Sequence, residues 1–242
     1  MISRASRISN LLLIASIQAH KAFCTYFHNY PIQPLNKYPQ MLLPHYYEGL
    51  TEAGCDEAGR GCLAGSVYAA AVILPDNYSN EMLNDSKKLT AKQRYALRET
   101  IINDAVAWAV GIVDAKEIDK INILNASILA MHRAIDSLSV RPQALIIDGN
   151  KFKPYGDLPY QTIVKGDGKY MAIAAASILA KTFRDDYMNR LSEEYPQYGW
   201  DKNAGYPTKV HREAIKKYGV TPYHRMSYNL LGGPKQLELD FK

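Results

Sequence analysis

The sequence contains little cysteine. Its three cysteines, Cys24, Cys55 and Cys62, are odd in number, and none belongs to a Cys-x-x-Cys pair. A disulfide framework needs paired cysteines, and a structural zinc site needs closely spaced thiolate or imidazole ligands, so the pattern argues against both. It favours a reducing compartment, which we take to be the cytoplasm. We expect Cys55 and Cys62 to be small, half-buried apolar side chains.

Acidic residues are absent from the first 47 positions, which hold four basic residues, Arg4, Arg7, Lys21 and Lys37. The whole chain has 29 basic and 24 acidic residues, so 29 − 4 leaves 25 basic against 24 acidic residues from position 48 onward. Because the body is nearly neutral, affinity for nucleic acid must come from local basic clusters and not from a bulk field.

A long apolar run is also lacking. The run over residues 11–17 follows two arginines but is too short to span a membrane, and no small-x-small cleavage site follows it. We therefore expect no membrane association. We interpret residues 1–40 as an extension, either a targeting segment or a mis-called start, residues 41–230 as one folded domain, and residues 231–242 as a flexible tail.

Strands and helices alternate from residue 50 onward. Apolar runs predict strands over 50–55, 67–74, 105–113, 144–147 and 161–164. Helical spacing of apolar residues predicts helices over 91–103, 117–138 and 170–194. The first of these helices opens with a capping box formed by Thr90 and Gln93. This order predicts an α/β fold.

Acids follow three of the predicted strands. Asp56 and Glu57 follow the first, Asp148 the fourth and Asp167 the fifth. Loops converge at strand ends in open α/β sheets, so the four acids could form one cluster. Four carboxylates repel one another unless cations intervene, and hard oxygen ligands suit Mg²⁺ or Mn²⁺. The alternative is turn chemistry at Asp148 and Asp167, which both stand beside glycine.

Basic and aromatic residues suited to phosphate and sugar contacts lie nearby in the sequence. Lys181 and Arg184 share one stripe of the predicted helix 170–194, although a solvated surface stripe is the commoner meaning of such a pair. Tyr206 lies between Gly205 and Pro207, where it either presents its ring to a ligand or packs in the core.

Six segments resemble, in order, the signature blocks of type 2 ribonuclease H, the bacterial ribonuclease HII family. They are DEAGRG (56–61), DSKKL (85–89), DGN (148–150), KGD (165–167), AAASILAK (174–181) and GYPT (205–208). The resemblance covers about residues 49 to 230. It implies a ribonuclease H-like fold with a mixed central sheet flanked by helices and a helical C-terminal portion.

The resemblance also implies an activity and a site. The family cuts the RNA strand of RNA/DNA hybrids and cuts 5′ to single ribonucleotides embedded in duplex DNA, leaving 3′-hydroxyl and 5′-phosphate ends. Asp56, Glu57, Asp148 and Asp167 would bind two divalent ions, Mn²⁺ or Mg²⁺. We expect the following substrate contacts: Gly59, Arg60, Gly61 and Tyr206 at the ribonucleotide, and Lys87, Lys181 and Arg184 at phosphates.

Two departures from the family pattern lie outside these groups. Ser66 stands where the family usually has proline, and Tyr228 stands where it usually has phenylalanine. At the C-terminus, Gln236 to Phe241 resembles the peptide that docks on bacterial sliding clamps, although a frayed terminus would look the same. We expect the chain to be a monomer.

Two other classes of protein remain open from the sequence. One is another metal-dependent nuclease of the same superfold, such as a type 1 ribonuclease H or a junction resolvase. The other is a non-catalytic phosphate or nucleic-acid binding module. Its glycine loop lacks the Gly-Lys-Ser/Thr ending of a nucleotide-binding loop, and such a module has no use for four acids.

Overall fold

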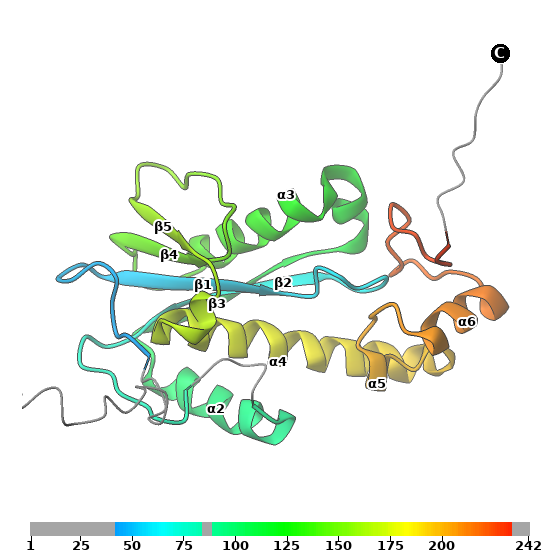
Figure 1. Cartoon of the computed structure of the whole chain (residues 1–242), viewed down its shortest axis with the longest axis horizontal. Helices are drawn as coiled ribbons and strands as arrows, with labels where there is room; N and C mark the ends of the chain where they lie inside the picture. Colours follow the sequence, from blue (N-terminus) through cyan, green and yellow to red (C-terminus); the bar gives the residue numbers. More distant parts are fainter. Residues whose placement is uncertain (1–41, 84–88, 234–242) are drawn as a thin grey trace, which may run out of the picture. The chain divides into compact units, whose positions relative to one another are not determined.

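The computed structural model describes residues 42–83 and 89–233. Within these residues a five-stranded sheet has the order β3-β2-β1-β4-β5 (Figure 1). The strands are β1 (Glu52–Ala58), β2 (Val67–Ile73), β3 (Ala107–Val113), β4 (Ala144–Asp148) and β5 (Tyr160–Ile163). The pairs β1–β2 and β2–β3 are antiparallel, whereas β1–β4 and β4–β5 are parallel. The predicted mixed sheet is confirmed.

Helices cover both faces of the sheet (Figure 1). They are α2 (Ala91–Asp104), α3 (Ala115–Asp136) and α4 (Met171–Glu194). Every residue of β2 is buried: Ala70 and Val72 pack in one cluster with α4 and α2, and Ala69 and Ala71 pack in another with α3. A strand covered on both faces needs apolar side chains at every position, which explains the continuous apolar run in the sequence.

The end of β1 differs from the prediction. Asp56 and Glu57 lie inside the strand, because its antiparallel pairing continues to Ala58, opposite Tyr68 of β2. The parallel pairing on its other side stops earlier, with Cys55 opposite Ile147. At Asp56 and Glu57, β1 is therefore paired with β2 on one side but not with β4 on the other. This leaves room beside them for a site.

Local capping explains where two helices begin. The Thr90 side chain accepts a hydrogen bond from Gln93 N (3.3 Å), and Gln93 Oε1 accepts one from Thr90 N (2.8 Å), so the predicted capping box is confirmed. Asp114 caps α3 by accepting from Glu117 N (2.8 Å). α3 is interrupted at Asn122, whose backbone φ of 65° is not helical.

The C-terminal portion is helical, as the family resemblance implies. Its elements are η2 (Pro196–Tyr198), α5 (Trp200–Asn203) and α6 (Lys209–Tyr218), and a further 3₁₀ turn, η1 (Gly166–Gly168), precedes α4. Tyr198 and Trp200 are fully buried and stack with ring centroids 5.0 Å apart. They pack with Leu63 and Met188, so this small core ties the C-terminal portion to α4 and to the segment after β1.

Burial corrects one expectation about the cysteines. Cys55 and Cys62 are both completely buried, not half-buried: Cys55 lies in the central strand β1, and Cys62 lies in a buried part of the loop that follows β1. In the described part of the chain no helix is long and apolar enough to cross a bilayer.

The close approach of β1 to α4 gives a prediction about stability. A Cβ atom at Gly54 would lie 2.3 Å from the carbonyl carbon of Ala172 and 2.5 Å from the amide nitrogen of Ile173. Because backbone cannot move aside as a flexible side chain can, we expect Gly54→Ala to lower the free energy of unfolding by about 3 kcal/mol or more, measured by urea denaturation.

Gly156→Ala is the control. Gly156 has no neighbour within 4 Å of such a Cβ and carries only the cost of its positive φ of 55°, about 1 kcal/mol. Equal losses in the two variants would contradict a steric role for Gly54.

Candidate active site

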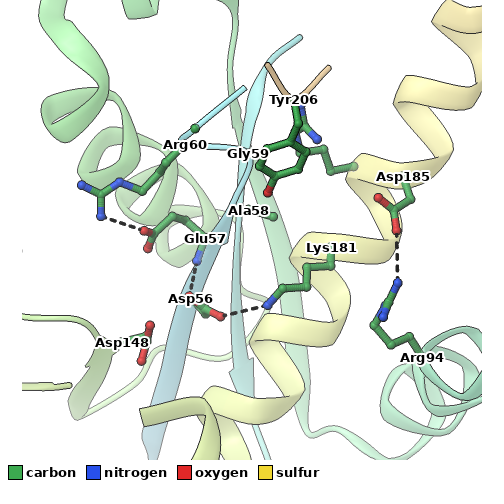
Figure 2. Close-up of a pocket in the computed structure, with 12 residues that line it drawn as sticks. Asp56, Glu57, Ala58, Gly59, Arg60, Arg94, Asp148, Lys181, Asp185 and Tyr206 are labelled. Atoms are coloured by element: carbon green, nitrogen blue, oxygen red, sulfur yellow. Dashed lines mark hydrogen bonds and ion pairs between the residues drawn. The ribbon is translucent and has the colours of Figure 1, made fainter. Parts of the chain in front are cut away.

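Three of the four predicted acids meet in one cleft of about 440 Å³ (Figure 2). Asp56 and Glu57 come from β1 and Asp148 ends β4. Since Cys55 pairs with Ile147, the parallel register places Asp56 and Asp148 side by side on adjacent strands. The remaining residues that line the cleft are Ala58, Gly59, Arg60, Gly61, Arg94, Lys181, Arg184, Asp185 and Tyr206.

Each of these three carboxylates already accepts a hydrogen bond or faces a cation. Asp56 Oδ1 accepts from Glu57 N (2.7 Å), and Asp56 Oδ2 lies 3.9 Å from Lys181 Nζ. Glu57 Oε1 accepts from Arg60 Nη1 (3.1 Å). Asp148 Oδ1 accepts from Gly166 N (2.6 Å).

The electrostatics of the cleft disfavour the charged carboxylates. Burial raises the pKa of Asp56 to about 8, and although Lys181 opposes this shift, the charges of Glu57 and Asp148 add to it. Burial also raises the pKa of Glu57, against the attraction of Arg60. Such a shift marks a site where a cation would stabilise the ionised form.

Asp167 takes a different position. It lies in η1, directly before α4, and only 2% of its surface is exposed. It is not among the residues that line the cleft, but its neighbour Gly166 donates to Asp148. The structure thus groups three acids at the surface of the cleft and buries the fourth next to a residue that contacts one of them.

The donor chemistry fits a hard divalent cation, because the cleft offers carboxylate oxygens whose mutual repulsion a cation would relieve. Within residues 42–83 and 89–233, no three Asp, Glu, His or Cys side chains are yet grouped closely enough to hold an ion. Lys181 lies beside Asp56, and Arg60 pairs with Glu57.

Arg184 lines the cleft, but its guanidinium is directed at the backbone. It is 2% exposed, and its guanidinium donates to three backbone carbonyls, those of Ser66 (3.1 Å), Ala204 (3.0 Å) and Ala64 (3.2 Å). These bonds hold the segment after β1. Gly59 belongs to the same packing, since a Cβ there would lie 2.1 Å from Arg184 Nε.

Of the two lysines predicted to contact phosphates, one lies in the described part of the chain. Lys181 lines the cleft and points toward Asp56 (Figure 2). Lys87 lies outside the described residues. The acidic pair that follows Arg184 is oriented toward α2: Asp185 lies 4.0 Å from Arg94, and Asp186 pairs with Arg98. Both acids therefore have arginine partners on α2.

Tyr206 lies at the cleft with 48% of its surface exposed, so it is not a packed core residue. Its carbonyl accepts a hydrogen bond from His211 Nδ1 (3.0 Å), which must carry the proton because a carbonyl only accepts. His211 Nε2 then accepts from Trp200 Nε1 (2.9 Å). Burial lowers the pKa of His211, which keeps the ring neutral and this arrangement intact.

Three residues that were not predicted as metal or substrate contacts also shape the site. Arg94 and Asp185 line the cleft, and Arg225 is fully buried beneath the segment after β1. Arg225 donates to the carbonyls of Gly65 (3.0 and 2.8 Å) and Arg60 (2.9 Å). Arg225 and the carbonyls that it contacts are 160 or more positions apart in the sequence, so no local pattern could have revealed these contacts.

A mixed α/β sheet with acids grouped on two adjacent parallel strands, beside a glycine-rich loop, defines a metal-dependent nuclease of the ribonuclease H class. The family model for ribonuclease HII matches residues 53–231 of the chain. The ribonuclease HII of Bacteroides thetaiotaomicron is 71% identical over 201 residues, which cover 83% of this chain and 100% of that protein. The chain belongs to the ribonuclease HII family.

Solved structures agree with this assignment. The crystal structure of ribonuclease H2 from Pyrococcus horikoshii OT3 has a TM-score of 0.65 and 27% identity, covering 74% of this chain and 94% of that one. The structure of a PCNA:RNase HII complex from Archaeoglobus fulgidus has a TM-score of 0.64 and 26% identity, covering 77% and 98%. The predicted ribonuclease H-like fold is confirmed, and the family uses divalent metal ions.

The raised pKa of Asp56 predicts how the stability of the metal-free protein depends on pH. Between its unfolded value of 3.8 and its folded value of about 8, the folded state holds a proton that the unfolded state has lost. Stability therefore falls as pH rises through this window, by at most about 1.4 kcal/mol per pH unit for one group. The lowered pKa values of His211 and His224 act in the opposite direction over part of this window, so the test compares the change in the free energy of unfolding between pH 5 and pH 7 in the wild type and in Asp56→Asn, by urea denaturation in EDTA.

Asp56→Asn removes this titration, so the variant should lose less stability than the wild type over the same range. Asp157→Asn, in an exposed loop, is the control and should keep the wild-type slope. An unchanged slope in Asp56→Asn would show that other groups govern the dependence.

Proposed function

We propose that this chain is an endonuclease that hydrolyses the RNA strand of RNA/DNA hybrids and cuts 5′ to single ribonucleotides embedded in duplex DNA. Membership of the ribonuclease HII family supports this function. The observation that carries it is the grouping of Asp56, Glu57 and Asp148 in a cleft that also exposes Gly61 and Tyr206. A reaction centre and a surface for reading the sugar thus occupy one cleft.

The proposed ligands of two divalent ions, Mn²⁺ or Mg²⁺, are Asp56, Glu57, Asp148 and Asp167. Such ions, when bound, activate a water and stabilise the leaving oxygen of a phosphodiester. The protein's own contribution is to keep the carboxylates close together at the point where β4 ends beside β1. The products would be 3′-hydroxyl and 5′-phosphate ends.

The remaining cleft residues bind and orient the nucleic acid. The side chain of Lys181 projects into the cleft beside Asp56, where a phosphate of the cut strand would lie, and Lys87 is proposed as a second phosphate contact. Arg184 acts indirectly, through the carbonyls that it holds. Arg60 is half-exposed and pairs with Glu57, so it can exchange that partner for a phosphate.

Recognition of the ribonucleotide depends on its 2′-hydroxyl, the group that distinguishes RNA from DNA. We assign this recognition to the backbone of Gly59, Arg60 and Gly61. Gly61 and Tyr206 face the same space, since a Cβ at Gly61 would lie 3.8 Å from Tyr206 Cε1. The exposed Tyr206 ring would pack on the adjoining sugar. We place the enzyme in the cytoplasm and expect it to act as a monomer.

The decisive assay uses a DNA duplex with one embedded ribonucleotide, an all-DNA control duplex, and Mg²⁺ or Mn²⁺. We expect the full chain to cut only the first duplex, on the 5′ side of the ribonucleotide. Asp148→Asn should lower the cleavage rate by about 100-fold or more, because it removes a proposed metal ligand. Its affinity for the duplex in EDTA should stay close to that of the wild type.

Asp157→Asn, a change of the same kind in an exposed loop, is the control and should cut at the wild-type rate. A folded wild-type protein that binds both duplexes and cuts neither would instead support a non-catalytic binding module. Cutting that requires several consecutive ribonucleotides, or a branched duplex, would support the other nucleases of this superfold.

A second proposal concerns Gln236 to Phe241, which lie outside the described residues. The structure from Archaeoglobus fulgidus contains RNase HII bound to PCNA, a sliding clamp. We propose that Gln236 to Phe241 docks in the apolar groove of a bacterial clamp as an extended peptide.

A peptide spanning Pro234 to Lys242 should bind the cognate clamp saturably in a fluorescence-anisotropy titration. The same peptide with Gln236→Ala and Phe241→Ala should bind at least about tenfold more weakly, because it lacks two anchoring side chains. Equal binding of both peptides, or none by the first, would rule out this contact.

A further inference from the structure

We infer that Tyr228 is a positioning residue for ribonucleotide selection: its hydroxyl fixes the peptide between Arg60 and Gly61, so that the Gly61 N–H is presented to the cleft. This inference rests on the proposed function, because it concerns the loop to which we assign recognition of the 2′-hydroxyl. It adds a residue that lies 168 positions away in the sequence.

The contacts converge on one carbonyl oxygen. Tyr228 Oη donates to the Arg60 carbonyl at 2.8 Å, and Arg225 Nη1 donates to the same oxygen at 2.9 Å. The two donors also contact each other, with Arg225 Nη1 3.3 Å from Tyr228 Oη and the guanidinium carbon 5.3 Å from the centre of the tyrosine ring. The Arg60 carbonyl therefore points firmly toward the protein.

The geometry of the peptide bond transmits this orientation to Gly61. A trans peptide is planar, and its C=O and N–H point in opposite directions. No cis peptide occurs in the described residues, so holding the Arg60 carbonyl inward directs the Gly61 N–H outward. This N–H has no hydrogen-bond partner among the described residues, and Gly61 is exposed at the cleft.

Tyr228 is itself held in place from α3. Asp119 accepts hydrogen bonds from Met226 N (2.9 Å), Ser227 N (2.9 Å) and Ser227 Oγ (2.6 Å), and Tyr228 N donates to the Arg225 carbonyl (3.0 Å). These bonds, with that from Arg225 N to the Leu63 carbonyl (2.8 Å), fix the turn over residues 225–228 against both α3 and the loop after β1. The Tyr228 hydroxyl acts as a rigid donor against which the Arg60 peptide is aligned.

The family usually has phenylalanine at position 228, so the hydroxyl of Tyr228 is the feature in which this chain departs from the family pattern. Phenylalanine would leave Arg225 as the remaining donor to the Arg60 carbonyl, and the peptide could then rock about that single bond. The substitution Tyr228→Phe thus removes one oxygen atom and nothing else. It is the sharpest available test.

The matched control is Tyr198→Phe. Tyr198 Oη also donates to a backbone carbonyl, that of Gly219, at 2.9 Å, but this bond lies in the C-terminal core and not on the Arg60 peptide. Each variant loses one hydroxyl-to-carbonyl bond, worth about 1 kcal/mol of stability, and Tyr228→Phe also loses the longer contact from Arg225 Nη1 (3.3 Å). Any difference between them in substrate selection is then specific to the Arg60 peptide.

Two quantities are measured for the wild type and both variants. The first is the ratio of affinities in EDTA for a duplex with one ribonucleotide and for the all-DNA duplex. The second is kcat/KM for cutting at the ribonucleotide. For Tyr228→Phe we expect both to fall about three- to tenfold, with unchanged affinity for all-DNA duplex, because only the contact to the 2′-hydroxyl is weakened.

For Tyr198→Phe both quantities should equal those of the wild type. Wild-type values in Tyr228→Phe, or an equal loss in the two variants, would overturn the inference. So would an equal weakening of Tyr228→Phe toward both duplexes, since that would indicate a general binding defect. If the wild type itself leaves the ribonucleotide uncut and unselected, the proposed function fails, and the result is distinct from a failure of Tyr228 alone.

Discussion

The burial of carboxylates that repel one another is the constraint on which the site depends. Asp56, Glu57 and Asp148 lie in one cleft, where burial and the neighbouring negative charges raise the pKa of Asp56 and of Glu57. A fold selected only for stability would replace them, because uncompensated buried charge is costly. Here the nearby donors, above all Lys181, offset part of that cost without neutralising the group. A bound cation would therefore stabilise the carboxylates more fully than Lys181 does.

Function also depends on how β1 continues into the loop that follows it. Three residues separate Glu57 from Gly61, so the proposed metal ligands and the proposed recognition loop are covalently close. Two buried guanidiniums, those of Arg184 and Arg225, hold the carbonyls of this loop. Buried arginines here serve as rigid multiple donors, a use to which the planar guanidinium is better suited than lysine.

Much of this arrangement could be predicted from the sequence, because it follows from local patterns. Apolar runs located the five strands, and Thr90 with Gln93 located the start of α2. The predicted end of β1 was wrong, because the antiparallel pairing of β1 with β2 extends beyond its parallel pairing with β4. The burial of Arg184 could not be predicted, because helical spacing groups residues on a stripe but does not reveal which part of the chain covers that stripe.

The bonds between the Arg60–Gly65 segment and Arg225 or Tyr228 join residues 160 to 168 positions apart. During synthesis, which proceeds from the N-terminus, both strands with the cleft acids are complete long before Arg225 and Tyr228 leave the ribosome. The hydrogen bonds that hold the Arg60 carbonyl can therefore form only when nearly the whole chain has been made. The order of synthesis thus makes the support of the proposed recognition loop one of the last steps in folding.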